Sequence, residues 1–353
     1  MEVIKQKLNI VKTSFSLRLF LKGVVGVFVL YAAIFGYFYY KSPSLEKKQI
    51  ETLPSKTTII RNTEFSTDIV IHDAGHSDPD KAGVQPLGSV PVTGLYEKGK
   101  VGGVKPIIRE ADNLMPFNAY KRPYDIRSVG TKPVISLGLF EAGTSKAATE
   151  TALKQLPPEV SFILSPYTPD IDYWVRQSRS YGHEVWLILP METVHYPRHD
   201  FGAHTLLTQT PIRENMDKLN WVLESTVGYT GFVTPYDATF IESLEDARPI
   251  LRELGSRGLG FINASKYSSA VMKKFYLSMN APYGHTPVWI DMPPSKTDIQ
   301  QKLEELEKQA RRTGHASAIF NAFPVSYQEI IKWNKTLKEK GIVLAPLSVE
   351  AEL

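Results

Sequence analysis

The feature that most constrains the fold is an alternation of short apolar runs with helical segments from residue 132 to the C-terminus. The apolar runs lack polar alternation, which is typical of strands buried on both faces of a parallel sheet. We expect strands at 134–137, 160–164, 185–189, 231–233, 259–262, 287–290, 316–320 and 342–345. Strands that alternate with helices in this way require parallel pairing through right-handed crossovers.

The predicted helices have recognisable start and stop signals. Thr168 and Pro169 precede one helical segment and Gly182 follows it, as expected from the preference for proline in the first turn and glycine after the last. Ser326 and Glu329 have the spacing of a capping box before another helix. The sequence therefore predicts an α/β fold, which is either a barrel-like (β/α) arrangement or an open sheet.

In either architecture, ligands bind beyond the C-terminal ends of the strands. The side chains at or just after those ends are Glu141, Tyr167, Asp170, Glu192, His195, His199, Tyr236, Asp237, Asn263, Lys266, Asp291 and Asn321. The candidate cleft residues among them are Glu192, His195, Tyr236, Asp237, Asp291 and Asn321. No catalytic residue is assigned from the sequence.

Histidines are concentrated in the segment 183–204. His195 and His199 are four residues apart, a helical ligand spacing, but Pro197 lies between them and opposes a helix. A relocated metal site, loop histidines that line a cleft and solvated loop histidines are the alternatives. His183 lies where a helix gives way to a strand, so its imidazole is expected to bind local backbone groups.

An apolar stretch near the N-terminus is long enough to span a bilayer. Residues 19–40 contain a single charged side chain, Lys22, and about 20 apolar residues cross a hydrocarbon core. A signal peptide would have a shorter apolar region followed by small residues. Basic residues are equally numerous on the two sides of this stretch, so charge does not decide its orientation. The simpler arrangement has the short N-terminal tail inside and the large domain outside. We expect a cytoplasmic tail at 1–18, a single-pass inner-membrane anchor at 19–40 and a C-terminal domain in the periplasm.

Residues 41–125 show no sustained periodicity. The stretch 72–91 is rich in Gly, Pro, Ser and Asp, which favour loops or disorder. His72 and His76 lie among aspartates there, but no apolar residues nearby would fix a metal site, so a solvated loop is favoured. We therefore expect a largely irregular linker at 41–125 and a folded domain at 126–353.

Composition excludes several classes of function. The chain has no cysteine, so it has neither disulfides nor thiolate sites. A net charge of +4, from 41 basic and 37 acidic side chains, is weak. The basic residues form no stripe of the kind that nucleic-acid binding requires. A membrane surface or a cell-wall glycan is compatible with this charge.

Several segments together resemble a known family. They read YKRPYDIR (120–127), GHEVWLILPME (182–192), HTLLTQTPIREN (204–215), GSRGLGFINAS (255–265), PVWIDMPP (287–294) and GIVLAPLS (341–348). From about residue 88 onward, the chain is similar to divergent polysaccharide deacetylases, particularly those of alphaproteobacteria. The resemblance implies a distorted (β/α) barrel of the glycoside hydrolase/deacetylase type, an envelope location and a role in carbohydrate metabolism.

The resemblance also implies a divalent metal held by Asp and His, and here the sequence departs from the family. The metal-binding positions of the family fall on Leu137, Gly138, Ile188, Pro235 and Asn321, and Asp291 is the acid that remains. Because a zinc site needs about three protein ligands, we expect no metal and no other cofactor.

Two functions remain open. The first is a catalytically degenerate protein, a pseudoenzyme, that binds peptidoglycan or another glycan or scaffolds envelope proteins, with its cleft used or unused. The alternative is an active carbohydrate hydrolase or deacetylase with a rearranged set, Glu192, His195, Asp237 and Asp291. The geometry at the strand ends separates them, because the cleft is either open and polar or plugged by Leu137, Ile188 and Pro235.

Overall fold

The computed structural model describes residue 37 and the ranges 85–267 and 270–352. Apart from Tyr37, the predicted membrane segment 19–40 lies outside these residues, as does the N-terminal part of the predicted linker. Among the described helices, none combines the length and the apolar character needed to cross a membrane.

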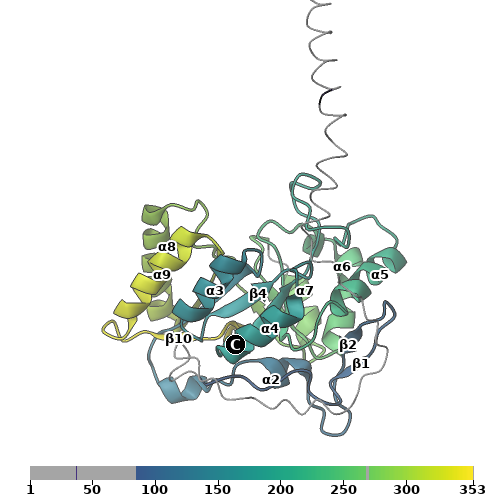
Figure 1. Ribbon diagram of the computed structural model, residues 1–353, viewed down its shortest axis with the longest axis horizontal. Helices are drawn as coiled ribbons and strands as arrows, with labels where there is room; N and C mark the ends of the chain where they lie inside the picture. Colours follow the sequence, from purple (N-terminus) through teal and green to yellow (C-terminus); the bar gives the residue numbers. More distant parts are fainter. Residues whose placement is uncertain (1–36, 38–84, 268–269, 353) are drawn as a thin grey trace, which may run out of the picture. The chain divides into compact units, whose positions relative to one another are not determined.

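A curled parallel sheet with helices around it forms the centre of the domain (Figure 1). Its strands are β3 (Val134–Ala142), β4 (Ser161–Leu164), β5 (Val185–Ile188), β6 (Gly231–Val233), β7 (Gly260–Asn263), β8 (Tyr283–His285), β9 (His315–Asn321) and β10 (Val343–Ala345). Neighbouring strands follow the order β10-β3-β4-β5-β6-β7-β8, and β9 also pairs with β3. After β8, Trp289 forms a parallel bridge with Ile319 of β9. This arrangement is consistent with the expected (β/α) barrel.

Helices follow most strands and cover the outside of the sheet, with α8 and α9 side by side (Figure 1). They are α3 (Lys146–Gln155), α4 (Ile171–Ser180), α5 (Ile212–Leu223), α6 (Leu244–Ser256), α7 (Ala270–Leu277), α8 (Lys296–Thr313) and α9 (Pro324–Leu337). Short 3₁₀ helices lie at Ile126–Val129, Phe240–Glu242 and Leu347–Ala351. α8 ends at Thr313, and its C-cap, Gly314, has a φ of +86°, the left-handed conformation that terminates a helix.

Two predicted helix signals are wrong. Thr168 and Pro169 do not start their helix, because α4 begins at Ile171 with Asp170 as its N-cap. Ser326 and Glu329 do not form a capping box, because α9 begins two residues earlier, at Pro324, with Phe323 as its N-cap. Ser326 therefore lies inside the first turn and is completely buried. Its hydroxyl donates to Asp291 at 2.6 Å, which links this helix to the C-terminal edge of the sheet.

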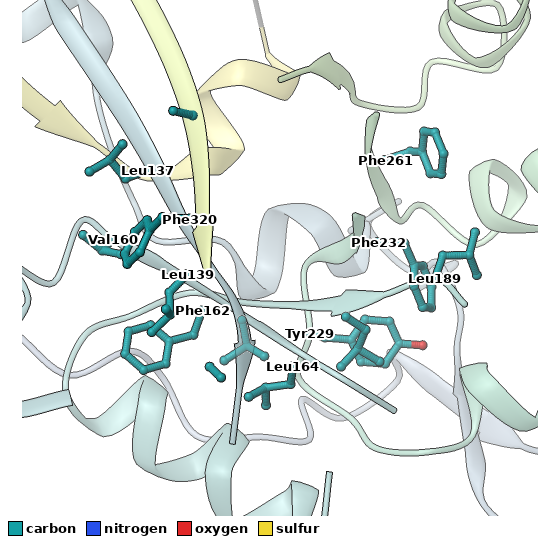
Figure 2. Close-up of a cluster of buried hydrophobic side chains, with 14 of the residues drawn as sticks. Leu137, Leu139, Val160, Phe162, Leu164, Leu189, Tyr229, Phe232, Phe261 and Phe320 are labelled. Atoms are coloured by element: carbon teal, nitrogen blue, oxygen red, sulfur yellow. The ribbon is translucent and has the colours of Figure 1, made fainter. Parts of the chain in front are cut away.

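The core has two layers, one on each face of the sheet. Leu137, Leu139 and Phe320 belong to the outer layer, which packs against the helices (Figure 2). Ile188 and Ile319 belong to the inner layer, which fills the interior of the curled sheet. Neighbouring residues on a strand alternate between the layers, which explains why the strands carry no polar alternation.

β3 extends five residues beyond its predicted end, to Ala142. Leu139 and Phe140 continue its pairing with β4 and β9, and the register shifts between Phe140 and Ala142. The strand end therefore carries Phe140 and Glu141, and Leu137 points into the outer core. The prediction at 287–290 is also displaced, because β8 lies at Tyr283–His285 and only Trp289 of the predicted run forms a described bridge.

Residues 85–125, predicted as part of the linker, belong to the same compact unit as the sheet. They contain an antiparallel pair, β1 (Tyr96–Lys98) with β2 (Val104–Pro106), and the short helix α2 (Pro116–Tyr120). Phe117 of α2 is 1% exposed and packs edge-on against Trp186 of the inner layer. The folded unit thus begins before the expected boundary at 126, and α2 covers the N-terminal end of the sheet.

Candidate functional site

Two adjoining cavities lie at the C-terminal edge of the sheet, and together we call them the cleft. The first, of about 720 Å³, contains Tyr167 and is called the tyrosine cavity. The second, of about 770 Å³, contains Trp289 and is called the tryptophan cavity. The residues common to both are Glu141, His199, Phe201 and Asp237. The cleft lies where the parallel topology predicts a ligand site.

The interior of the curled sheet below the cleft is filled with apolar side chains. Ile188 and Val233 are fully buried there, and Phe140 meets Trp289 edge-on with ring centroids 4.9 Å apart. The layer is tightly packed at Gly138, where an added Cβ would come within 2.8 Å of Ile163 Cδ1 and 2.9 Å of Ile319 Cδ1 and would force these side chains to shift. The interior is therefore packed, whereas the cleft above it is open. Leu137 faces the outer layer, so its side chain does not fill the cleft.

Asp291 lies at the tryptophan cavity with both carboxylate oxygens engaged. Its Oδ2 accepts hydrogen bonds from the Asn321 backbone N–H at 2.8 Å and the Ser326 hydroxyl at 2.6 Å. Its Oδ1 accepts from Asn321 Nδ2 at 2.9 Å. Burial raises the pKa of Asp291, and these hydrogen bonds partly oppose the increase. The carboxylate therefore holds β9 and α9 together at the edge of the sheet.

The divalent metal implied by the deacetylase fold does not fit these residues. A metal at Asp291 would have to displace Asn321 and Ser326 from its oxygens. In the part of the chain that the structure describes, no group of three His, Asp or Glu side chains is arranged to hold a metal ion. The positions equated with ligands in the sequence carry Ile188 and Pro235, which have no ligand atoms in their side chains.

Two carboxylates of the cleft have no hydrogen bond or ion pair to any described residue. Glu141 is solvent-exposed and has a φ of +59°, an uncommon backbone conformation for a side chain of this size. Its side chain is accessible, but neighbouring protein atoms partly desolvate its carboxylate, which raises its pKa. Asp237 follows β6, and its backbone carbonyl accepts from Val194 N–H at 3.1 Å while its side chain remains uncommitted.

One wall of the cleft is a loop fixed by its own side chains. Asp200 accepts hydrogen bonds from Gly202 N–H at 3.0 Å and from the Thr205 hydroxyl at 2.7 Å. The Tyr167 hydroxyl accepts from His204 N–H at 2.6 Å. The His204 ring in turn stacks on Trp221 with centroids 3.9 Å apart. His199 and Phe201 therefore occupy the cleft from a preformed wall.

The structure brings four of the six predicted cleft residues together. Tyr236, Asp237, Asp291 and Asn321 all line the tryptophan cavity. Glu192 does not, because its carboxylate accepts from the backbone N–H and hydroxyl of Thr208, at 2.7 and 2.8 Å. His195 is exposed and contacts the ring of His199 outside the lining of either cavity. Of the rearranged set that formed the alternative, Asp237 and Asp291 line one cavity, whereas Glu192 and His195 lie outside the lining of both.

Other cleft residues were missed or undervalued by the sequence reasoning. Glu141 and His199 are among the side chains expected after the strand ends but not among the six candidate cleft residues, and the structure adds both to the cleft. Phe201 and Trp289 are apolar, and no sequence pattern separates an aromatic cavity wall from an ordinary core residue. Ser326 was assigned to helix capping, which hid its contact with Asp291.

The comparisons with known proteins agree with this architecture. The sequence profile described as divergent polysaccharide deacetylase matches residues 141–349, and the chain belongs to this family. A crystal structure of an uncharacterised Agrobacterium tumefaciens C58 protein is 28% identical, with a TM-score of 0.65 over 70% of this chain and 99% of that one.

A Bdellovibrio bacteriovorus peptidoglycan deacetylase is 12% identical, with a TM-score of 0.36 over 76% of this chain and 67% of that one. A mutant of a CE4-family pseudoenzyme with restored enzymatic activity is also 12% identical, with a TM-score of 0.36 over 62% of this chain and 68% of that one. No curated protein matches the chain.

Proposed function

We propose that this chain is a glycan-binding member of its family that does not carry out metal-dependent deacetylation. The observation that carries the proposal is the combination of an open, preformed cleft with an Asp291 whose oxygens are both engaged by Asn321 and Ser326. The family fold is retained, and a cleft lies at the C-terminal edge of its sheet. Asp291, which would help to hold a water-activating metal, instead holds β9 and α9 together.

The walls of the cleft suit a sugar polymer. Tyr236 and Phe201 present aromatic surface, and the buried Trp289 ring supports that of Tyr236 edge-on with centroids 5.8 Å apart. Aromatic walls with a few placed polar groups are the usual composition of a ligand site. The apolar faces of sugar rings pack on such walls, and their hydroxyls donate to carboxylates such as Glu141 and Asp237. Two adjoining cavities accommodate neighbouring units of one chain.

The cellular setting is part of the same proposal. Residues 19–40 would anchor the protein in the inner membrane, with the cleft in the periplasm, where peptidoglycan or another envelope glycan is within reach. The proposal includes envelope proteins as further partners of such a scaffold and does not include nucleic acid. Support comes from the apolar length of 19–40 and from the family membership.

Replacing Tyr236 with alanine is expected to weaken glycan binding about tenfold, because an aromatic platform contributes roughly 1 kcal/mol beyond the area that it buries. Isothermal titration of the full-length chain, in mild detergent, with soluble peptidoglycan fragments and amino-sugar oligomers measures the effect. Tyr96→Ala is the matched control, since Tyr96 is an exposed tyrosine on β1 outside the lining of the cleft. Equal affinities of Y236A and the unaltered chain would place the glycan elsewhere.

Zinc is expected to leave the protein unchanged. Titration with zinc should show no stoichiometric binding, and a chelator should not lower the unfolding temperature, because bound metal would stabilise the folded state in proportion to its affinity. Zinc measured in the dialysed protein and a melting curve with and without chelator provide the readouts. Saturable zinc binding, accompanied by acetate release from acetylated sugar oligomers, would overturn the proposed function.

A further inference from the structure

The charge of the cleft differs in sign from that of the whole chain. The cleft lining contains four acidic residues, Glu141, Asp200, Asp237 and Asp291, and neither lysine nor arginine among the residues described for its two cavities. The full chain has a net charge of +4. Asp200 and Asp291 accept hydrogen bonds from neutral protein donors, so the carboxylates free to take a new donor are those of Glu141 and Asp237.

The two uncommitted carboxylates lie at the junction of the cavities. Both residues contribute to both linings, so a ligand that runs from one cavity to the other passes them. A neutral sugar would cover these carboxylates without compensating their charge, and burying an unpaired charge is unfavourable. A ligand that carries a positive charge at this point removes that cost.

A buried hydroxyl in the tyrosine cavity also lacks a partner. Thr168 is 7% exposed, and its Oγ1 forms no hydrogen bond with the described residues. It lines the same cavity as Glu141 and Asp237. This oxygen is itself enclosed by protein, so a ligand in the cavity would reach it only after the Thr168 side chain rotates.

The aromatic walls are suited to the same ligand. Ammonium groups are attracted to the faces of aromatic rings, and the Lys266 ammonium already lies 5.7 Å from the centroid of Tyr236. Tyr236 and Trp289 border Glu141 and Asp237 in the tryptophan cavity. The cleft thus combines aromatic surface for sugar rings with two carboxylates that have no protein donor and can pair with an amine.

We infer that the cleft takes a glycan with free, protonated amino groups, and that Glu141 and Asp237 pair with the ammonium. This inference rests on the proposed function and specifies its ligand class. Free amines on amino-sugar polymers arise when the amide of an N-acetylated sugar is hydrolysed. The ligand is therefore the product of a deacetylation reaction carried out by another protein, and this chain binds that product.

The test compares two oligomers that differ only in acetylation. Titration of the full-length chain at low ionic strength with glucosamine hexamer and with N-acetylglucosamine hexamer should show about tenfold or tighter affinity for the free amine, the factor expected of a partly buried ion pair. The preference should shrink as salt is added, because salt screens the interaction. Nonspecific attraction would oppose this result, since the chain and the amine oligomer are both positive.

Variants without the two carboxylate charges test which residues cause the preference for the free amine. The double variant Glu141→Gln with Asp237→Asn is expected to reduce the ratio of the two affinities to about twofold or less, since its ion pairs are gone. Glu304→Gln removes an exposed carboxylate from α8, outside the cleft, and should leave the ratio unchanged. A retained preference in the double variant overturns the inference.

The remaining outcomes separate this inference from the proposed function. Equal or tighter binding of the N-acetylated hexamer overturns the inference and leaves the proposed function standing. Binding of neither hexamer, nor of soluble peptidoglycan fragments, removes both. A lysine hexapeptide that binds as tightly as the glucosamine hexamer also overturns the inference, because the site would then select charge without selecting sugar.

Discussion

Glu184→Ala is expected to lower the free energy of unfolding by about 4 kcal/mol or more, because it leaves several buried donors without an acceptor. Glu184 is 0% exposed and accepts five hydrogen bonds. Its Oε1 accepts from the Ser161 hydroxyl at 2.8 Å, Trp186 Nε1 at 2.9 Å and Ser348 N–H at 2.8 Å. Its Oε2 accepts from Arg122 N–H at 3.0 Å and the Ser348 hydroxyl at 2.7 Å.

The size of the expected effect follows from the position of these donors. They come from β4, β5, the segment before β3 and the 3₁₀ helix near the C-terminus, so one carboxylate joins four parts of the chain. Alanine removes the acceptor for all of them and opens a cavity between them. Ser348→Ala removes one donor and is expected to cost about 1 kcal/mol, as does the loss of a single hydrogen bond.

Chemical denaturation, monitored by tryptophan fluorescence, measures the unfolding free energies of Glu184→Ala and Ser348→Ala. Glu304→Gln, on the exposed face of α8, is the control and should change the unfolding free energy by less than about 0.5 kcal/mol. Glu184→Ala should also lower the melting temperature by about 10 °C, the shift that this loss produces in a domain of this size. A loss below about 1 kcal/mol for Glu184→Ala would mean that water replaces the carboxylate without penalty.

The fold was largely predictable because its strands are short, apolar and separated by helices. Strands at 231–233 and 260–263 lie within one residue of their predicted positions. The errors arise where a local pattern had to compete with tertiary contacts. β3 continues through Phe140 because β4 and β9 supply partners beyond Leu137. The segment 85–125 has few strong local signals, and it is held by contacts such as that of Phe117 with Trp186.

The candidate site was predictable only in part, for a related reason. Polar residues that follow strands were identifiable by position, and Tyr236, Asp237, Asp291 and Asn321 lie in the cleft. Whether such a residue is free or engaged depends on partners distant in sequence. Asp291 is engaged by Ser326, 35 residues away, and Glu192 by Thr208, 16 residues away. Glu141 could be recognised as uncommitted only once the true end of β3 was known.

His183 gives the second large expected effect, a loss of stability in acid. The imidazole is 0% exposed, its Nδ1 lies 2.8 Å from the Val160 carbonyl and its ring packs against Phe162. Burial lowers its pKa from 6.5 to about 4, with the Val160 carbonyl opposing the decrease. The sequence reasoning anticipated this backbone contact from the position of His183 between helix and strand.

The direction of the pH effect follows from the lowered pKa of His183. Below pH 6.5 the unfolded chain binds a proton that the folded chain does not, so the unfolding free energy falls as pH decreases. The contribution is complete above pH 6.5 and is lost by pH 4, up to about 3 kcal/mol in total.

His183→Asn keeps a donor toward Val160 and removes this titration, so the stability advantage of the unaltered chain should shrink steadily between pH 6.5 and 4. Denaturation of both proteins at several pH values measures the difference, with the exposed His195→Asn as the matched control. A difference between H183N and the unaltered chain that stays constant with pH would show that the buried imidazole accepts its proton without unfolding.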